Sequence, residues 1–144
     1  MKVLILILCI FSGSLFAASI RHATQGIVFD TDTQLMWQDT AVSTKSDWEE
    51  AIAVCQHSLL GGFTDWRLPN INELLSLIDY SKDDPALKNI AFQSGNLNGN
   101  YWSSTSDLDD HLRAWKINFT NGNPLAVIKR SITEQYYVRC VRGG

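Results

Sequence analysis

The residues whose types and spacing come closest to a chemical site are three carboxylates, Asp107, Asp109 and Asp110, which lie in the single segment 106–111. Oxygen-rich loops suit calcium. A pair of carboxylates could instead supply the acid and the base or nucleophile of glycoside hydrolysis. Acidic loops are most often solvated turns, however, so the segment is interpreted first as a turn, then as a weak calcium candidate, and last as a catalytic pair.

Other signatures of catalysis or metal binding are missing from the sequence. The three histidines, His22, His57 and His111, are scattered and lack zinc-like spacing. The sequence contains no nucleophile elbow, phosphate-binding loop or dinucleotide fingerprint. We therefore expect no catalytic residues and no required cofactor, and interpret the chain as a protein other than an enzyme.

An amino-terminal signal peptide is predicted over residues 1–18. Lys2 provides the positive end, residues 3–11 form a short apolar run, and small residues in 12–18 suit cleavage. No later segment is long and apolar enough to span a membrane. The mature chain is thus expected to be exported, to the periplasm, the cell surface or the extracellular space.

Charge and length restrict the class of protein further. Without Lys2 the chain has 11 basic and 15 acidic residues, a net charge of −4, which argues against nucleic acid as a partner. Residues 19–144 suffice for one ordinary domain, and over the full 144 residues hydrophobic residues make up 45% and charged residues 19%.

Two cysteines, Cys55 and Cys140, remain after the predicted signal peptide. An even number of cysteines in an exported chain predicts a disulfide, and two cysteines allow only one pairing. A catalytic or metal-binding thiol is the alternative, but no base or ligand set accompanies either residue.

Two strands and two helices are predicted in the first half of the chain. Residues 26–30 and 35–38 alternate as paired strands should, with a polar turn between them. A capping box with Ser46 as the N-cap predicts the start of the first helix. Its apolar face is formed by Trp48, Ala51, Ile52, Cys55 and Leu59.

A second capping box, Asn70 with Glu73, starts a short helix that extends to Ile78. Residues 89–100 are predicted to form a long loop, with Phe92 as a possible anchor. Strands follow at 101–104, 114–119, 125–128 and 136–142, and Asn121-Gly122 signals a hairpin. This order predicts an α+β fold in which two helices pack on a twisted antiparallel sheet.

The loops 93–113 and 120–124 are the predicted ligand surface. Burial of Trp102 is favoured over an open position, although it follows the polar loop. A local basic patch of Lys129, Arg130, Arg139 and Arg142 is a further possibility, with ordinary surface charge the preferred interpretation. The predicted ligand-binding residues are Trp102, Asn96, Asn98, Asp107, Asp109, Asp110, Asn121 and Asn123.

Several residues are interpreted as structural rather than functional. Arg67 can pair with Asp65 or Glu73, and Trp66 can fill the junction between helices and sheet. Trp115 alternates with apolar neighbours and is predicted to lie in the core. The predicted structural residues are Asp65, Trp66, Arg67, Pro69, Trp115 and Arg139.

The order of several blocks resembles the Lcl C-terminal domain family, named after the end domain of a bacterial collagen-like adhesin. The blocks are 26–30, 35–38, 48–51, Cys55, 65–70, 73–74, 101–105, 114–115 and 137–142. The resemblance implies export, a C-type-lectin-like fold and surface binding rather than catalysis. A bridge from the first helix to the last strand would suit that fold.

Some family features have no counterpart here. The chain lacks collagen repeats, the calcium-binding tripeptides of sugar-binding lectins, and the functional cysteine pair of the related formylglycine-generating enzymes. The resulting hypothesis is an exported bacterial binding or adhesion module that recognises a surface glycan or protein. The alternatives are a structural component of an envelope or surface assembly, which would self-associate, and a glycan-acting enzyme that uses the acidic loop.

Overall fold

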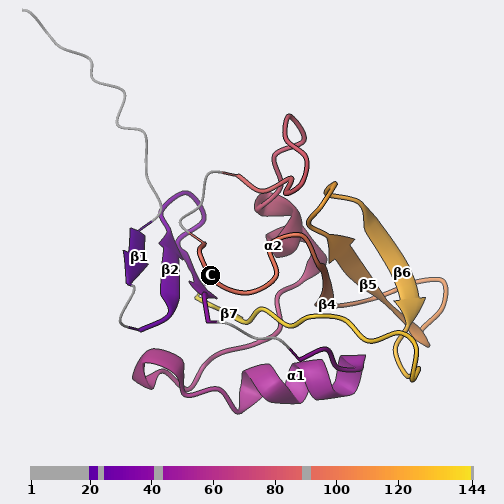
Figure 1. The fold of residues 1–144 in the computed structure, drawn as a ribbon. Helices are drawn as coiled ribbons and strands as arrows, with labels where there is room; N and C mark the ends of the chain where they lie inside the picture. Colours follow the sequence, from indigo (N-terminus) through magenta and orange to yellow (C-terminus); the bar gives the residue numbers. More distant parts are fainter. Residues whose placement is uncertain (1–19, 23–24, 41–43, 89–91, 144) are drawn as a thin grey trace, which may run out of the picture.

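The computed structural model describes residues 20–22, 25–40, 44–88 and 92–143. The predicted signal peptide lies outside these residues. The described part is a mixed α+β fold with two α-helices, a short 3-10 helix and two antiparallel sheets (Figure 1). No helix in these ranges has the length and apolarity needed to cross a bilayer.

The prediction of one sheet was wrong, because the strands form two. The closing segment 136–142 joins them: Tyr137 bridges to Tyr101 of the second sheet, and β7 (Val141–Arg142) pairs with the first. A short segment that contacts two sheets in turn has the same alternating sequence as a strand of one sheet, so the pattern could not distinguish the cases.

The first sheet has the order β1-β2-β3-β7. Its other strands are β1 (Ile20–His22), β2 (Ile27–Asp30) and β3 (Leu35–Gln38). The predicted polar turn between β2 and β3 is confirmed: the Asp30 carboxylate accepts hydrogen bonds from the Asp32 backbone N–H and the Thr33 hydroxyl. Both faces of this sheet pack against apolar residues.

The second sheet has the order β4-β5-β6, formed by β4 (Asn100–Ser106), β5 (Arg113–Asn118) and β6 (Pro124–Ile128). The predicted hairpin at Asn121-Gly122 joins β5 to β6, and Gly122 has a φ of +75° there. Such a positive φ favours glycine because it has no Cβ.

Helix α1 (Trp48–Gln56) begins one residue later than predicted. Its N-cap is Asp47, whose carboxylate accepts a hydrogen bond from the Glu50 N–H. The backbone of Ser46 is instead paired in both directions with Tyr136, which holds Ser46 in an extended strand-like position. Leu59 was predicted on the apolar face but lies beyond the helix end and is 70% exposed.

The 3-10 helix η1 (Leu60–Gly62) leads toward helix α2 (Ile71–Ser76). The predicted capping box of α2 is confirmed, since Asn70 and Glu73 each accept a hydrogen bond from the other's backbone N–H. The helix ends before Ile78, because Ile78 forms a β-bridge with Leu87.

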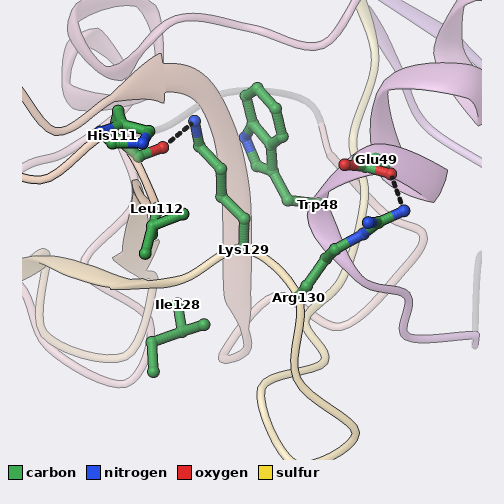
Figure 2. Close-up of a pocket in the computed structure, with 7 residues that line it drawn as sticks. All are labelled: Trp48, Glu49, His111, Leu112, Ile128, Lys129 and Arg130. Atoms are coloured by element: carbon green, nitrogen blue, oxygen red, sulfur yellow. Dashed lines mark hydrogen bonds and ion pairs between the residues drawn. The ribbon is translucent and has the colours of Figure 1, made fainter.

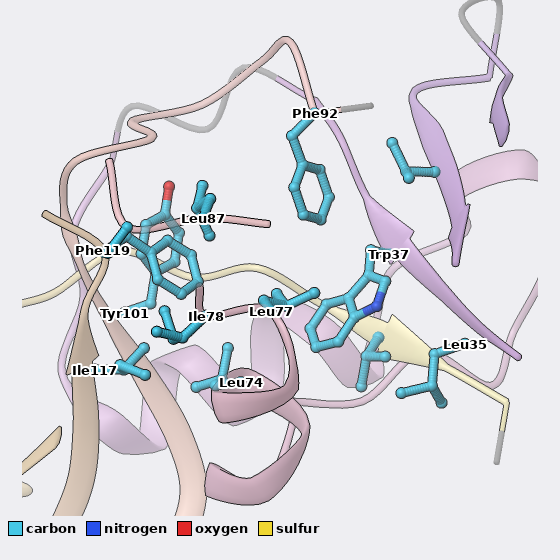
Figure 3. Close-up of a cluster of buried hydrophobic side chains, with 13 residues drawn as sticks. Leu35, Trp37, Leu74, Leu77, Ile78, Leu87, Phe92, Tyr101, Ile117 and Phe119 are labelled. Carbon is cyan, nitrogen blue, oxygen red and sulfur yellow. The ribbon is translucent and has the colours of Figure 1, made fainter. Parts of the chain in front are cut away.

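The apolar side chains form two clusters. The first packs α2 between the two sheets and includes Trp37, Leu74, Tyr101 and Phe119 (Figure 3). The second lies beneath α1 and includes Trp66, Trp102 and both cysteines. Phe92 belongs to the first cluster, so its predicted role as an anchor of the long loop is confirmed.

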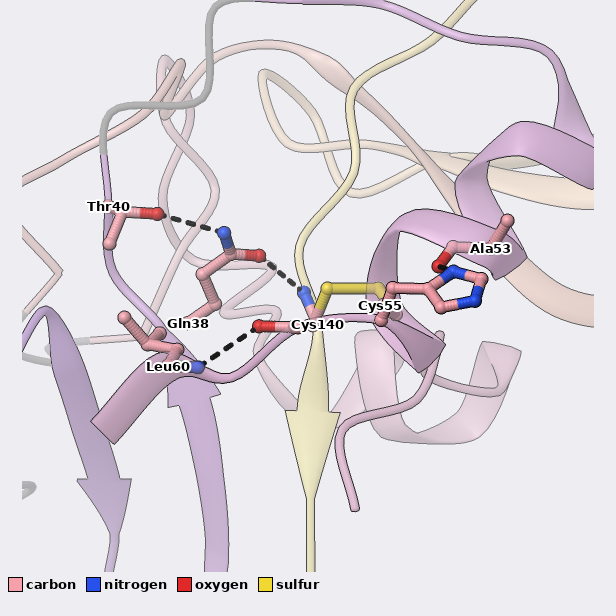
Figure 4. The surroundings of a disulfide bond; sticks show 8 residues. Gln38, Thr40, Ala53, Cys55, Leu60 and Cys140 are labelled. Carbon is pink, nitrogen blue, oxygen red and sulfur yellow. Dashed lines mark hydrogen bonds between the residues drawn. A yellow bond between two sulfur atoms is a disulfide. The ribbon is translucent and has the colours of Figure 1, made fainter. Parts of the chain in front are cut away.

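The predicted disulfide is confirmed and joins Cys55 of α1 to Cys140, the residue before β7 (Figure 4). Both cysteines are fully buried. Gln38 fixes the other side of Cys140: its backbone N–H donates to the Cys140 carbonyl, and its side-chain carbonyl accepts from the Cys140 N–H. The bridge therefore fastens α1 to the first sheet.

Candidate functional site

A pocket of about 460 Å³ lies between the start of α1, the end of β6 and the loop before β5 (Figure 2). We call it the groove. Arg130 also lines a second hollow of about 330 Å³, with Ile132 on its wall. The residues that line the groove are Trp48, Glu49, His111, Leu112, Ile128, Lys129 and Arg130.

Lys129 occupies the centre of the groove and is held by three contacts. Its ammonium group lies 4.2 Å from the centre of the Trp48 ring and donates hydrogen bonds to the Ser106 hydroxyl at 2.7 Å and the His111 carbonyl at 2.8 Å. The Trp48 indole N–H donates to the Ser103 carbonyl at 2.8 Å. The ring and the cation are therefore already positioned before any ligand arrives.

Arg130 is the more accessible cation. One of its Nη atoms lies 2.8 Å from the Glu49 carboxylate, and the two side chains are 76% and 55% exposed. An ion pair this exposed is weak. A guanidinium has five N–H donors, so Arg130 retains donors for a ligand while Glu49 orients it.

Apolar side chains form the rest of the groove wall. Leu112 is 63% exposed and Ile128 is 50% exposed, which is unusual for neighbouring aliphatic residues in a protein with two well-packed clusters. With Trp48, they give the groove an apolar wall beside two cations. Such a surface can bind a ligand that has an apolar face and a negatively charged group.

The predicted ligand-binding residues lie in two separate groups rather than on one surface. The asparagines lie at the β4 start and the β5–β6 turn, whereas the acidic loop lies at the β4 end. The seven residues of β4 separate the two groups, which corresponds to roughly 20 Å at about 3.3 Å per residue.

The asparagine side chains hold turns together. Asn96 accepts from the Asn98 N–H and donates to the Tyr137 hydroxyl, while Asn98 also donates to the Asp84 carboxylate. The Asn121 side chain accepts from the Asn123 N–H. These bonds account for why asparagine is frequent in the segment.

Trp102 is fully buried, which confirms the favoured interpretation and contradicts its inclusion among the ligand-binding residues. Its indole N–H donates to the Ser46 carbonyl at 2.9 Å, and its ring packs edge-on against Tyr136. The preceding loop is polar, but β4 is covered on both faces, so its residues are buried regardless of that loop.

The acidic loop has the local structure of a solvated turn. The Asp107 carboxylate accepts from the Asp109 N–H, and the Asp110 carboxylate accepts from the Leu112 N–H. In the described part of the chain, no group of three or more His, Cys, Asp or Glu residues is arranged to hold a metal ion. The weak calcium candidates are therefore not gathered into a binding site.

The possible basic patch, which was the less favoured interpretation, does not form. Lys129 and Arg130 lie at the groove, whereas Arg139 is buried and faces Asp39. Arg142 donates two hydrogen bonds to the Asp65 carboxylate. The sequence could not distinguish these arginines, because alternation along a short segment does not show which carboxylate each one meets.

The structural interpretation of the Asp65–Pro69 region is confirmed. Trp66 is buried and donates to the Leu60 carbonyl, and Pro69 is fully buried. Arg67 forms two hydrogen bonds with Glu73, at 2.8 and 2.6 Å. Burial alone would raise the pKa of Glu73, but the hydrogen bonds and charge of Arg67, with the Asn70 N–H, hold that pKa below its usual value.

The core position predicted for Trp115 was wrong. Trp115 is only partly buried and belongs to neither cluster, whereas its neighbours Ala114 and Lys116 are buried. Lys116 donates to the Asn100 side-chain carbonyl at 2.6 Å, and burial lowers the pKa of its ammonium group. Simple alternation requires one buried face, but both faces of β5 are covered.

The groove was predicted only in part. The predicted ligand surface 93–113 contains Leu112, and Lys129 and Arg130 belong to the possible basic patch, whereas Trp48 was expected only on the helix face and Ile128 only in a strand. These residues come from three distant segments, so no local spacing could have revealed their proximity. A weak signal did exist: Leu112 directly follows the acidic loop, where an apolar residue has little reason to be.

The chain matches the model of a known family. The family model of the Lcl C-terminal domain matches residues 26–142, which include the whole groove and both cysteines. A comparison with curated proteins finds none that matches the chain.

Proposed function

Because the chain belongs to the Lcl C-terminal domain family, we propose that it is an exported binding module that recognises a glycan or a protein at a bacterial surface. The supporting observation is the groove, where an aromatic ring, two exposed aliphatic side chains and two cations meet. We further infer a C-type-lectin-like arrangement, with the disulfide fastening α1 to the last strand. The proposed activity is binding without turnover.

Export is supported by the chemistry of the cysteines. Disulfides persist in oxidising compartments and are rare where thiols are kept reduced. Cys55 and Cys140 are both buried and bonded to each other. Together with the signal peptide predicted at residues 1–18, this supports a periplasmic, surface or extracellular location.

The groove favours an anionic surface glycan as the ligand. Arg130 can donate two parallel hydrogen bonds to a carboxylate or sulfate. Trp48, Leu112 and Ile128 supply apolar area against which the face of a sugar ring can pack. The net charge of the chain is negative, so we expect recognition to depend on these local contacts rather than on general attraction to polyanions.

A glycan array probed with the purified, disulfide-bonded protein tests this function. We expect saturable binding to a class of acidic glycans, and recovery of the glycan unchanged. Arg130→Gln should weaken binding about 10- to 100-fold, because a hydrogen bond to a charged group contributes about 1.5–3 kcal/mol. Leu112→Asp should weaken it as well.

Lys88→Gln is the matched control, since it removes the same charge from an exposed residue that does not line the groove. Glycan binding that is unchanged in both groove variants would contradict the groove as the binding site. Absence of binding to any glycan would contradict the glycan ligand and favour a protein partner.

A further inference from the structure

Lys116 of β5 places a buried amino group against the side chain of Asn100 on β4. The Lys116 nitrogen donates to the Asn100 amide oxygen at 2.6 Å, and the residue is only 8% exposed. Because a C=O bond is about 1.2 Å long, this nitrogen lies at most about 3.8 Å from the amide carbon. That limit is close to the separation of about 3–3.5 Å from which a bond between two such atoms can form.

Strand pairing fixes this approach. In the pairing of β4 with β5 (Figure 1), Asn100 lies opposite Asn118, and Lys116 is two residues before Asn118 on the same face. Asn100 and Lys116 are therefore diagonal neighbours, a relation that a long side chain can bridge. The Asn100 carbonyl also accepts from the Tyr137 N–H, which holds the start of β4 from its other edge. Backbone pairing thus positions both groups.

Aromatic side chains cover the amino group. The Lys116 nitrogen lies 5.0 Å from the centre of the Tyr136 ring, and that ring packs edge-on against the buried Trp102. Burial disfavours the charged form and lowers the pKa of Lys116. A larger fraction of Lys116 than of an exposed lysine is therefore the neutral amine, which is the nucleophilic form.

A carboxylate completes the arrangement. Glu134 accepts a hydrogen bond from the Tyr136 hydroxyl, and its charge acts on Lys116, where it opposes the effect of burial on the pKa. Burial and Glu134 together raise the pKa of the Tyr136 hydroxyl, so this group keeps its proton and remains a donor to the carboxylate. Glu134 is therefore held near the amine, where it can accept a proton and return it.

We propose that Lys116 and Asn100 join spontaneously in an isopeptide bond between β5 and β4. Glu134 first takes a proton from the Lys116 ammonium group. The Lys116 nitrogen then attacks the amide carbon of Asn100 and forms the new C–N bond. The bond from that carbon to the original amide nitrogen breaks, and this nitrogen leaves as ammonia with a proton from Lys116 that Glu134 carries. Ammonia departs as ammonium with the proton first taken, so the reaction needs no oxidant, reductant or external reagent.

The cross-link complements the disulfide. The bond between Cys55 and Cys140 fastens α1 to the first sheet, whereas the bond between Lys116 and Asn100 lies within the second sheet. Reductants that open a disulfide leave an amide intact. The inference is independent of the proposed ligand, since neither Lys116 nor Asn100 lines the groove.

Mass spectrometry of the purified, disulfide-bonded protein tests the proposal. We expect an intact mass that is lower, by one ammonia, than the mass of the disulfide-bonded chain. Trypsin should not cleave after the acylated Lys116, so the digest should contain residues 89–113 joined to residues 114–129. A full intact mass, or peptides that end at an unmodified Lys116, would overturn the proposal.

Loss of ammonia has a second chemical source, because an asparagine that precedes glycine can cyclise to a succinimide. Asn98 and Asn121 both precede glycine. A succinimide gives no cross-linked peptide and takes up water in mild alkali, whereas the isopeptide bond persists. Loss of ammonia without the cross-linked peptide would therefore contradict the proposal.

Three variants assign the roles of the residues. Lys116→Arg keeps a buried cation but should retain the full mass, because a guanidinium stays protonated and cannot attack the amide. Glu134→Gln should fold, by circular dichroism, and form the bond at least about 100-fold more slowly during refolding from denaturant, since general acid–base catalysis contributes about 10²–10⁴-fold. Lys88→Arg, at an exposed lysine, is the control and should lose ammonia as the unaltered protein does. An unchanged rate in the Glu134 variant would contradict the proton transfer by Glu134.

Discussion

The guanidinium of Arg139 lies 3.7 Å from the carboxylate of Asp39, and both side chains are almost completely buried. The pair links the end of β3 to the segment before β7. Arg139 also donates to the carbonyls of Gln38 and Ser94, and Asp39 accepts from the backbone N–H groups of Gln93 and Ser94. This buried network therefore connects three segments that are distant in sequence.

Arg139→Met should destabilise the fold by about 3–5 kcal/mol, because it removes the buried cation that faces the Asp39 carboxylate and breaks a buried ion pair. Chemical denaturation measures the loss in free energy of unfolding. Arg130→Met is the matched control: its ion pair with Glu49 is exposed, and the expected loss is below about 1 kcal/mol. Equal losses in the two variants would contradict a specific role for the buried pair.

The disulfide should contribute more than any exposed interaction in the protein. Cys55 and Cys140 are 85 positions apart, and closing a loop of that length in the unfolded chain corresponds to about 4 to 5 kcal/mol. The double variant Cys55→Ser, Cys140→Ser should lose about this free energy of unfolding. Reductant should lower the melting temperature of the unaltered protein and have no effect on the double variant. A reductant-insensitive melting temperature would contradict this prediction.

The Arg67–Glu73 pair should make stability depend on pH in acid. The pKa of Glu73 is lower in the folded protein than its usual value, so the folded state favours the carboxylate. The stabilisation is fully present above the unfolded pKa of about 4.3. It is lost as the pH falls through the lower folded value.

Glu73→Gln should therefore lose about 1 to 2 kcal/mol near neutral pH, a discounted value because the Arg67 side chain is 42% exposed. Denaturation of both proteins between neutral pH and pH of about 3 measures the effect. The difference in free energy of unfolding between the variant and the unaltered protein should become smaller as the pH falls. A difference that is constant with pH would indicate that the charge of Glu73 is not responsible.

Local sequence signals predicted the elements well. The β2 and β3 strands, the Asn70–Glu73 capping box and the Asn121-Gly122 hairpin each depend on residues within a few positions of one another. The disulfide was predicted because only one pairing was possible. Such features are determined by short-range chemistry, which a single sequence displays directly.

The candidate site was predicted only in part, because its assembly depends on long-range packing. Trp48, Leu112 and Lys129 meet only after α1 docks beside the second sheet. The error at Trp115 has a related cause, since covering both faces of β5 removes the simple alternation of buried and exposed residues. Polar loop composition also suggested ligand contacts at Asn96 and Asn121, where the amides in fact hold turns.

Two glycines allow backbone strain to be separated from steric clash. Gly62 has a φ of +79° and open space around the position of a Cβ, whereas a Cβ on Gly122, at φ +75°, would lie 2.6 Å from the Ile78 side chain. Gly62→Ala should lose about 1–2 kcal/mol of stability from the positive φ alone. Gly122→Ala should lose about 1–3 kcal/mol more from overpacking. Similar melting temperatures for the two variants would contradict the clash at Gly122.

The side chain of Lys129 should stabilise the wall of the groove. Its ammonium group joins the end of β6 to the Ser106 hydroxyl and the His111 carbonyl, and lies over the Trp48 ring. Lys129→Met keeps the apolar stem and removes all three interactions. We expect a loss of about 1 to 3 kcal/mol in stability, because two charge-assisted hydrogen bonds are lost from a partly exposed site.

The diagnostic result would be local. Amide exchange should become faster at Asp109 and Leu112, whose N–H groups close the turns of the acidic loop, while exchange at the buried Ile117 of β5 stays slow. Trp48 fluorescence should change as the cation leaves its ring. Lys88→Met, at an exposed lysine outside the groove, should leave the stability, the amide exchange of the loop and the Trp48 fluorescence unchanged. Unaltered exchange in the loop of the Lys129 variant would show that the wall is held by its own turns, and that Lys129 is available to bind a ligand directly.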